Sequence, residues 1–380
     1  MLRRYVTKNG KTLRCGYTTG ACAAAASGAA AELLLGGVAP EMWRLDTPKG
    51  VSLELDILEA GRGTDLARCA VRKDGGDDPD ITDGILVFAT VKKTDVGIFI
   101  DGGEGVGRVT KPGLDQPVGA AAINAVPRQM IREQVQAVCE RHGYGGGLSV
   151  VISIPGGEAL AKRTFNPRLG VEGGLSVIGT TGIVEPMSSA ALVDTVKLEL
   201  NVLRASGADA ALLCPGNYGE TFAREALRIP AKPVSIGNFA GDAVDAAVEA
   251  GFRTILLVGH IGKLVKLGIG ARNTHSANGD GRMETLCACA LAAGADAPLL
   301  RGIMACATTD AALALLDAAN LLKPTMVGLG GRIQSTLERW TPDAVDIGFV
   351  CYANRAPFDG VLVQSENAPS LMAALGRASD

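Results

Sequence analysis

Aromatic residues, histidines and an excess of basic charge are all scarce in this 380-residue sequence. Aromatic side chains make up 4% of it, and it has 3 histidines. Lys and Arg together number 37 against 40 for Asp and Glu, which gives a net charge of −3. Single-stranded nucleic acids are bound by aromatic stacking and by basic surfaces that neutralise phosphates. We therefore expect no nucleic-acid partner.

Paired cysteine motifs are also missing. The 9 cysteines are odd in number and scattered, mostly in apolar sequence, and no C-x-x-C occurs. Disulfide frameworks and zinc sites both need cysteines at regular, paired spacings. The sequence predicts reduced thiols in the cytoplasm and no metal ion bound by the protein.

Long, strongly apolar runs are absent as well. The 17 uncharged residues between Arg14 and Glu32 are mostly Ala, Gly, Thr and Cys. We consider this segment too weakly apolar for a membrane span or a signal peptide. It predicts a cytoplasmic protein that does not contact the membrane.

Glycine, by contrast, is abundant, with 50 residues. Because glycine has no Cβ atom, it adopts positive φ angles and lets a ligand approach the backbone closely. Glycine-rich turns between apolar segments are typical of a ligand-binding enzyme.

The chain is long enough for two domains, since domains usually contain about 100 to 200 residues. We expect an α/β protein with an α+β domain at 1–185 and a Rossmann-like domain with a mostly parallel sheet at 186–380. The first domain should contain a helix from Thr18 or Thr19 to Leu35, a helix at 127–141, and strands at 85–91, 96–100 and 148–154. After residue 174 we expect strands at 175–178, 211–214, 233–236, 254–258 and 346–350, with helices at 189–205, 242–250, 282–293 and 310–322.

Three glycine-containing loops follow predicted strands after residue 174, beginning at Gly179, Pro215 and Gly259. Parallel sheets hold their ligands beyond the carboxyl ends of the strands, where loops and helix N-termini expose backbone N–H groups. Any one loop is equally compatible with an ordinary turn, but together they favour a binding face. The candidate cofactor-binding residues are Gly179, Thr180, Thr181, Gly182, Gly216, Asn217, Gly259 and His260.

Charged residues lie beside glycines and prolines in the first half. Arginine forms bidentate pairs with carboxylates, so these positions are candidates for holding a substrate with several carboxylates. A charged hairpin and solvated arginines are the structural alternatives. The candidates are Asp101, Lys111, Arg128, Arg163 and Arg168. In the second half, His275 is a candidate proton carrier.

Several long segments resemble the cobalt-precorrin-5B C1-methyltransferases of the CbiD type. They lie at 16–26 (Gly-Tyr-Thr-Thr-Gly-Ala-Cys-Ala-Ala-Ala-Ala), 101–114, 123–128, 154–158, 164–170, 179–188, 215–219 and 257–266. Their order and length make coincidence improbable. One departure is Ala125, where the family has proline before Val-Pro-Arg, and it should change little chemically.

The resemblance implies a methyltransferase that uses S-adenosylmethionine to methylate carbon 1 of cobalt-precorrin-5B, giving cobalt-precorrin-6A in anaerobic cobalamin synthesis. The cobalt is then carried by the substrate. Because the macrocycle is the nucleophile, the protein chiefly aligns the reactants, while Glu104, Glu185 or His275 moves a proton. Other enzymes of the pathway and a second copy of the chain are possible partners.

Two alternatives remain open from the sequence. A non-catalytic tetrapyrrole carrier would need the macrocycle-binding face but no pocket for the methyl donor. A small-molecule kinase would need a phosphate-binding loop around Gly262 and Lys263. The required glycine and Ser or Thr are replaced by Leu257 and Leu264, which argues against the kinase.

Overall fold

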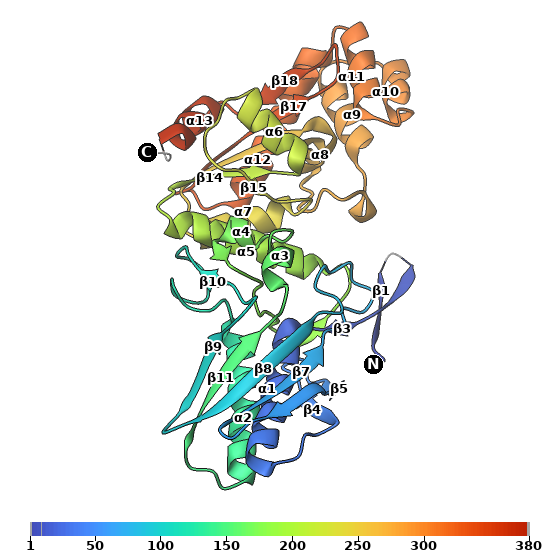
Figure 1. Cartoon of the computed structure of the whole chain (residues 1–380). Helices are drawn as coiled ribbons and strands as arrows, with labels where there is room; N and C mark the ends of the chain where they lie inside the picture. Colours follow the sequence, from blue (N-terminus) through green and yellow to red (C-terminus); the bar gives the residue numbers. More distant parts are fainter. Residues whose placement is uncertain (1, 9, 378–380) are drawn as a thin grey trace. The chain divides into compact units, whose positions relative to one another are not determined.

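A computed structural model describes residues 2–8 and 10–377 of the chain. The chain forms two compact units, Met1–Ser189 and Ala190–Asp380, and each is described by itself (Figure 1). The fold is mixed α/β, with parallel strand pairs in both units. The division into independently folding domains at 1–185 and 186–380 stays a prediction.

A sheet of order β6-β7-β8-β11-β9 forms the first unit's centre. Strand β11 runs parallel to β9, while the other neighbours are antiparallel. In β11 the residues are buried at alternate positions, so one face of the sheet meets the core. The bounds are β6 (Leu58–Arg62), β7 (Leu66–Arg72), β8 (Leu86–Thr94), β9 (Ile98–Gly102) and β11 (Gly147–Ser153).

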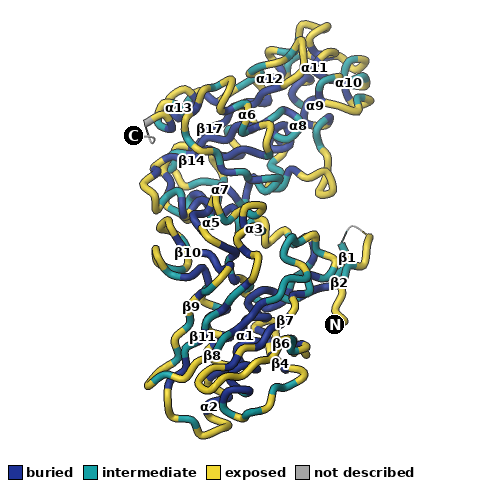
Figure 2. The backbone as a smooth tube through the Cα atoms, in the orientation of Figure 1, coloured by how far each residue is buried: buried dark blue, intermediate teal, exposed yellow. Residues whose placement is uncertain are grey.

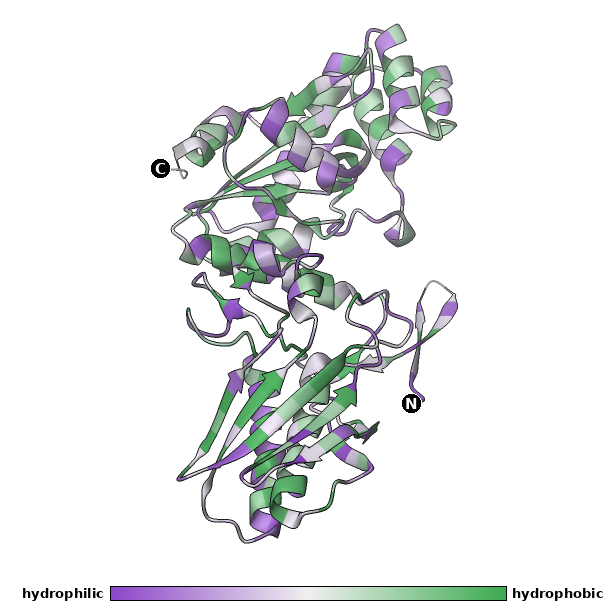
Figure 3. Ribbon diagram, viewed as in Figure 1, coloured by the Kyte–Doolittle hydropathy of each residue, from purple (hydrophilic) through white to green (hydrophobic). Residues whose placement is uncertain are grey.

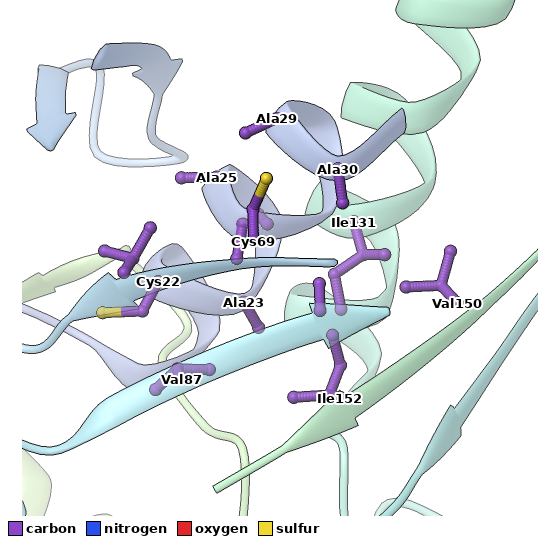
Figure 4. Packing of buried hydrophobic residues seen from close by; sticks show 14 of the residues in the cluster. Cys22, Ala23, Ala25, Ala29, Ala30, Cys69, Val87, Ile131, Val150 and Ile152 are labelled. Carbon is purple, nitrogen blue, oxygen red and sulfur yellow. The ribbon is translucent and has the colours of Figure 1, made fainter. Parts of the chain in front are cut away.

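Helix α1 (Thr19–Gly36) is the core helix of this unit and packs against α2 (Ala125–Arg141) and the sheet. The Thr18 side chain accepts a hydrogen bond from Ala21 N, and Gly37 closes the helix at φ 87°. Its alanines are small enough to let α2 and the strands approach closely. Figure 4 shows Ala30 beside Ile131 of α2, and Ala23 and Ile152 of β11 belong to the same hydrophobic cluster.

Helix α1 extends past the uncharged segment that ends before Glu32 and adds Leu33, Leu34 and Leu35, and by length and composition the whole helix could cross a membrane. Most of the helix is nevertheless buried inside the unit, as the dark tube in Figure 2 shows. Its apolar character is thus explained by the hydrophobic core that it forms.

Short strand pairs and helices surround the first sheet. Figure 3 shows that its strands β8 and β11 are rich in hydrophobic residues. The smaller pairs are β1 (Tyr5–Lys8) with β2 (Lys11–Arg14), β3 (Gly16–Tyr17) with β13 (Ile183–Val184), β4 (Met42–Asp46) with β5 (Ser52–Asp56), and β10 (Arg108–Val109) with β12 (Val171–Glu172). The short helices are α3 (Gly157–Ala161) and α4 (Asn166–Leu169).

The second unit is built on a sheet of order β15-β14-β16-β17-β18, in which the first four strands are parallel and β18 is antiparallel. The bounds are β14 (Ala210–Cys214), β15 (Val234–Ser235), β16 (Thr254–His260), β17 (Asp346–Ala353) and β18 (Gly360–Gln364). Every residue of β14 is buried, because helices cover both faces of the sheet.

The two faces of this sheet contribute to separate hydrophobic clusters. Helices α6 (Asn217–Glu225) and α13 (Ala368–Arg377) supply one cluster. The other contains residues of α5 (Ser189–Ala205), α7 (Ala240–Glu249), α8 (Ile261–Leu264), α9 (Arg282–Ala292), α10 (Ala297–Met304), α11 (Thr309–Ala318) and α12 (Leu322–Trp340). The 3-10 helices are η1 (Val265–Ile269) and η2 (Ser276–Asn278).

Most predicted elements occur close to their expected positions, and α5 has the predicted bounds. The strand expected at 175–178 is wrong, because Leu175 and Val177 make only isolated bridges within the first unit. The helix expected at 310–322 is α11 followed by the separate α12. The turn between them contains Asn320 at φ 56°, a conformation that Asn tolerates better than most residues.

Candidate functional site

The carboxyl edge of the second unit's sheet has the topology of a ligand site. Strand β14 lies between β15, which follows it in sequence, and β16, to which the chain crosses afterwards. The chain therefore changes direction between β14 and β16, and open α/β sheets bind ligands in the crevice at such a switch point. The loops after these two strands contain the candidate residues Gly216, Asn217, Gly259 and His260.

Glycines allow tight approaches at this edge. Gly216 precedes α6 with φ 88°, and a Cβ atom there would lie 3.6 Å from Lys263 Nζ. At Gly259 a Cβ atom would lie 2.9 Å from the Leu264 side chain. Gly216 therefore needs glycine for its backbone angle, and Gly259 needs it for the close packing of β16 against α8.

His260 ends β16 and caps α8. Its Nδ1 accepts a hydrogen bond from Gly262 N at 3.1 Å, so the proton of the neutral ring is on Nε2. Burial lowers the His260 pKa, and the opposing effects of Asp310 and Asn354 are smaller. At neutral pH the ring is thus an uncharged hydrogen-bond donor.

Lys263 supplies positive charge at the same edge. Its Nζ donates to Gly237 O at 3.1 Å, which joins the loop after β15 to α8. Burial lowers the Lys263 pKa, and no carboxylate in the described part of the chain offsets that effect. A half-buried ammonium group of this kind suits a ligand carboxylate or phosphate. The sequence showed Lys263 only as part of a failed phosphate-loop motif.

The loop Gly179–Gly182 belongs to the first unit and does not follow a strand of the parallel sheet. Its neighbour Ile178 accepts a hydrogen bond from Gly20 N at 3.0 Å, and Gly182 O accepts one from Thr18 N at 3.0 Å. The loop therefore holds the beginning of α1. These contacts favour a structural role for Gly179, Thr180, Thr181 and Gly182, whose predicted cofactor binding stays a prediction.

The acidic loop after β9 is braced by an ion pair. Both carboxylate oxygens of Asp101 accept from Arg108, at 2.8 and 2.9 Å, and this pairing lowers the Asp101 pKa. The Glu104 side chain is exposed, and its backbone oxygen accepts from Ile154 N at 2.8 Å. Asp101 is thus already paired, whereas the Glu104 carboxylate faces solvent.

Arg128 contacts the backbone around it. Its guanidinium donates to Ile123 O, Ile100 O and Ala121 O at 2.8, 2.9 and 3.2 Å. Half-burial lowers its pKa, yet the group stays charged because arginine is so basic. These bonds connect the start of α2 to β9 and to the loop before α2.

The other predicted substrate-binding cations are exposed. Lys111, Arg163 and Arg168 lie at the surface of the first unit. The Lys111 stem covers Gly170, where a Cβ atom would lie 2.5 Å from Lys111 Cγ, and Thr110 N donates to Gly170 O at 2.8 Å. Lys111 thus lies beside the α4 segment that carries Arg168. No local sequence pattern predicts this contact, because the two residues are far apart in the sequence.

The proposed proton carriers have different environments. Glu185 forms an ion pair with Lys49, which lowers the Glu185 pKa and keeps the carboxylate ionised near neutral pH. In the second unit, exposed His275 accepts from Ala277 N through Nδ1 at 3.1 Å and caps η2. No contact joins Glu104 to Glu185 within the described ranges, and the structure does not relate either of them to His275. In the described residues no group of His, Cys, Asp and Glu has the arrangement of a metal site.

Comparisons with known proteins cover most of the chain. A family model described as CbiD matches residues 6–186, and one described as CbiD, C-terminal domain matches residues 273–360. A cobalt-precorrin-5B C(1)-methyltransferase of Ruminiclostridium cellulolyticum is 43% identical over 100% of both chains. Proteins with the same name from Thermoanaerobacter sp. and Photorhabdus laumondii are 44% and 47% identical, over 90% and 82% of this chain and 93% and 82% of theirs.

One solved structure is also similar. It is a cobalamin biosynthesis protein (CbiD) from Archaeoglobus fulgidus with 28% sequence identity, covering 74% of this chain and 87% of its own, at a TM-score of 0.40.

Proposed function

Because the chain belongs to the CbiD family, we propose that it is a cobalt-precorrin-5B C(1)-methyltransferase of cobalamin biosynthesis. The observation that carries this proposal is 43% identity to a protein of that name over the full length of both chains. The methyl donor is S-adenosylmethionine, the product is cobalt-precorrin-6A, and cobalt enters with the substrate. The proposed location is the cytoplasm.

The methyl donor binds at the carboxyl edge of the second unit's sheet. In this proposal the second unit is a Rossmann-like domain. The residues present fit such a ligand: Lys263 offers a half-buried cation for its carboxylate, and His260 offers an Nε2–H donor. Gly216 and Gly259 let the ligand approach the backbone, and Asn217 begins the adjoining helix. When bound, S-adenosylmethionine supplies an electrophilic methyl group.

The first unit binds the macrocycle through its carboxylate arms. Lys111, Arg163 and Arg168 support this role because they are exposed cations, and two of them lie on neighbouring segments. Asp101 and Arg128 were predicted to join them. Their ion pair and backbone hydrogen bonds favour instead that they shape the loop and the helix behind the site.

The protein acts mainly by alignment. Holding the reacting carbon in line with the methyl group contributes up to roughly 7 to 11 kcal/mol in well-oriented systems. Among the proposed proton carriers, Glu104 has an exposed carboxylate, whereas the Glu185 carboxylate is paired with Lys49. We therefore expect Glu104→Gln to slow single turnover more than Glu185→Gln. Equal rates for both variants and the unmodified protein would exclude both carboxylates, leaving His275 to be tested.

The reaction itself is the decisive test. The protein is incubated anaerobically with cobalt-precorrin-5B and S-adenosylmethionine carrying an isotopically labelled methyl group, and the product is analysed by mass spectrometry and NMR. Label on carbon 1 is the expected result. Tight binding of the macrocycle without label transfer would contradict the proposal and favour a tetrapyrrole carrier.

A further inference from the structure

Four buried polar atoms without a hydrogen-bond partner belong to β16, β17, α6 and α11, which meet near the carboxyl edge of the second unit's sheet. Among the described residues they are Glu220 Oε1, His260 Nε2, Asp310 Oδ1 and the Tyr352 hydroxyl oxygen. The Asn354 side chain approaches His260 and favours its charged form, but without the geometry of a hydrogen bond to Nε2. Folded proteins leave few buried polar atoms unpaired, because desolvating them is costly. Four such atoms on elements that approach the same edge are candidates for contact with a polar ligand.

Ring contacts link three of the elements that carry these atoms. His260 and Tyr352 are register partners on β16 and β17, and their rings meet edge to face with centroids 5.6 Å apart. The other face of Tyr352 stacks on Phe222 of α6, with centroids 3.9 Å apart. The rings therefore fix α6 against the carboxyl ends of β16 and β17.

The two carboxylates belong to helices that begin near this edge. Glu220 is one helical turn into α6, and after burial it is the second cause that raises the pKa of Cys214, the last residue of β14. Asp310, in the first turn of α11, favours the charged form of His260. A Cβ atom on Gly219 of α6 would lie 2.9 Å from Val258 O and 3.3 Å from Cys214 Cβ, and one on Gly262 would lie 3.8 Å from Thr309 Oγ1 of α11. The first turns of α6 and α11 therefore both approach the carboxyl ends of β14 and β16.

Positively charged side chains of the protein neutralise the carboxylates of Glu220 and Asp310 only in part. Asp310 Oδ2 lies 3.9 Å from the exposed guanidinium of Arg355, which leaves Oδ1 unpaired. No ion pair of Glu220 is found in the part of the chain that the structure describes. Two carboxylate oxygens in a poorly solvated place attract a cation more strongly than they would in water.

Tyr352 strengthens the case for a ligand. Its side chain is 1% exposed, and its hydroxyl is among the four unpaired atoms. A phenylalanine would make the same ring contacts without burying a hydroxyl. The hydroxyl is therefore better explained by binding than by packing.

We infer that Glu220 and Asp310 recognise the positive charge of the methyl donor, while His260 and Tyr352 hydrogen-bond its polar groups. This inference rests on the proposed function. In methyl transfer the electron pair of the sulfur–methyl bond stays on sulfur, and an electron pair of the macrocycle forms the new carbon–carbon bond. The cationic sulfonium thus becomes a neutral thioether, S-adenosylhomocysteine. The carboxylates bind the charged donor and release the neutral product.

Calorimetric titration with both ligands tests this charge selection. We expect the unmodified protein to prefer S-adenosylmethionine over S-adenosylhomocysteine. Glu220→Gln and Asp310→Asn should each weaken binding of the cation by about tenfold, and binding of the thioether by less than about threefold. Glu225→Gln is the matched control, because Glu225 is exposed on the same helix and pairs with Arg224. It should change neither affinity.

Equal losses for the two ligands would overturn the inference, since the carboxylates would then contact a group that both share. Unchanged affinities would also overturn it. If the unmodified protein transfers the methyl group yet binds both ligands equally, the inference fails and the proposed function stands. If it prefers the cation but transfers nothing, the proposed function fails alone.

Tyr352→Phe gives an independent readout. Removing an unpaired buried hydroxyl should raise the thermal midpoint of the ligand-free protein, and the same change should weaken donor binding. A lower midpoint with unchanged affinity would show that the hydroxyl stabilises the fold and does not contact the donor.

Discussion

At the scale of single residues, Arg128 shows how a charged side chain can serve the fold. Its three hydrogen bonds go to backbone carbonyl groups of the first unit. We expect Arg128→Ala to lower the free energy of unfolding by about 2–4 kcal/mol, because carbonyl groups lose charged donors. Denaturant titration followed by circular dichroism measures this change.

Exposed Arg132, one turn further along α2, is the matched control for Arg128. Arg132→Ala should change the free energy of unfolding by no more than about 0.5 kcal/mol. The earlier prediction that Arg128 binds substrate makes a different forecast for Arg128→Ala: normal stability with a raised dissociation constant for the macrocycle. The two readouts together decide between the roles.

His260 should make stability depend on pH. Burial lowers its pKa below the ordinary 6.5, so near and below pH 6.5 the unfolded chain binds more protons than the folded protein. Its contribution to stability is therefore complete above pH 6.5 and is lost as the pH falls through the folded-state pKa. His260→Asn retains a capping oxygen for Gly262 N and should lose less stability between pH 7.5 and 5. Identical pH dependence in both proteins would contradict this expectation.

At the scale of elements, α1 depends on small residues. A Cβ atom on Gly28 would lie 2.4 Å from the Trp43 ring, whose Nε1 donates to Gln134 Oε1 at 2.9 Å. Gly28→Ala should therefore destabilise the protein by about 1–3 kcal/mol, although alanine is the better helix former. Thermal and denaturant unfolding measure the effect.

The matched control is Gly331 in α12, where a Cβ atom would have no neighbour within 4 Å. Gly331→Ala should stabilise the protein by up to about 1 kcal/mol through helix propensity alone. If both substitutions were stabilising, Trp43 would have room to move and the packing argument for α1 would fail.

At the scale of the whole molecule, the two units have separate cores and separate sheets. We predict that residues 190–380 expressed alone unfold cooperatively and bind S-adenosylmethionine, because the proposed donor-binding residues all lie there. Calorimetry with both fragments checks this expectation. Donor binding by residues 1–189 alone would instead support the predicted role of the loop Gly179–Gly182.

The sequence by itself determined the family, the α/β class and those elements that have clear local patterns, among them α1, α2, α5 and the central strands of both sheets. The cap at Thr18, the stop at Gly37 and the apolar strand Thr254–His260 are all visible along the chain. It missed several others, including α6, α10, α13 and the strands β4 to β7. It also missed α12, in which Gly328, Gly330 and Gly331 weaken the helical signal while packing against β17 and β18 favours the helix.

The tertiary structure alone decided which residues meet. It assigned the loop at Gly179 to the first unit, whereas the parallel sheet belongs to the second, and it showed that the Arg128 guanidinium donates to backbone carbonyl groups. It also brought the first turns of α6 and α11, which carry Glu220 and Asp310 90 positions apart in sequence, to the edge that carries His260. Residues distant in sequence become neighbours only through strand order and helix packing, which no local pattern contains.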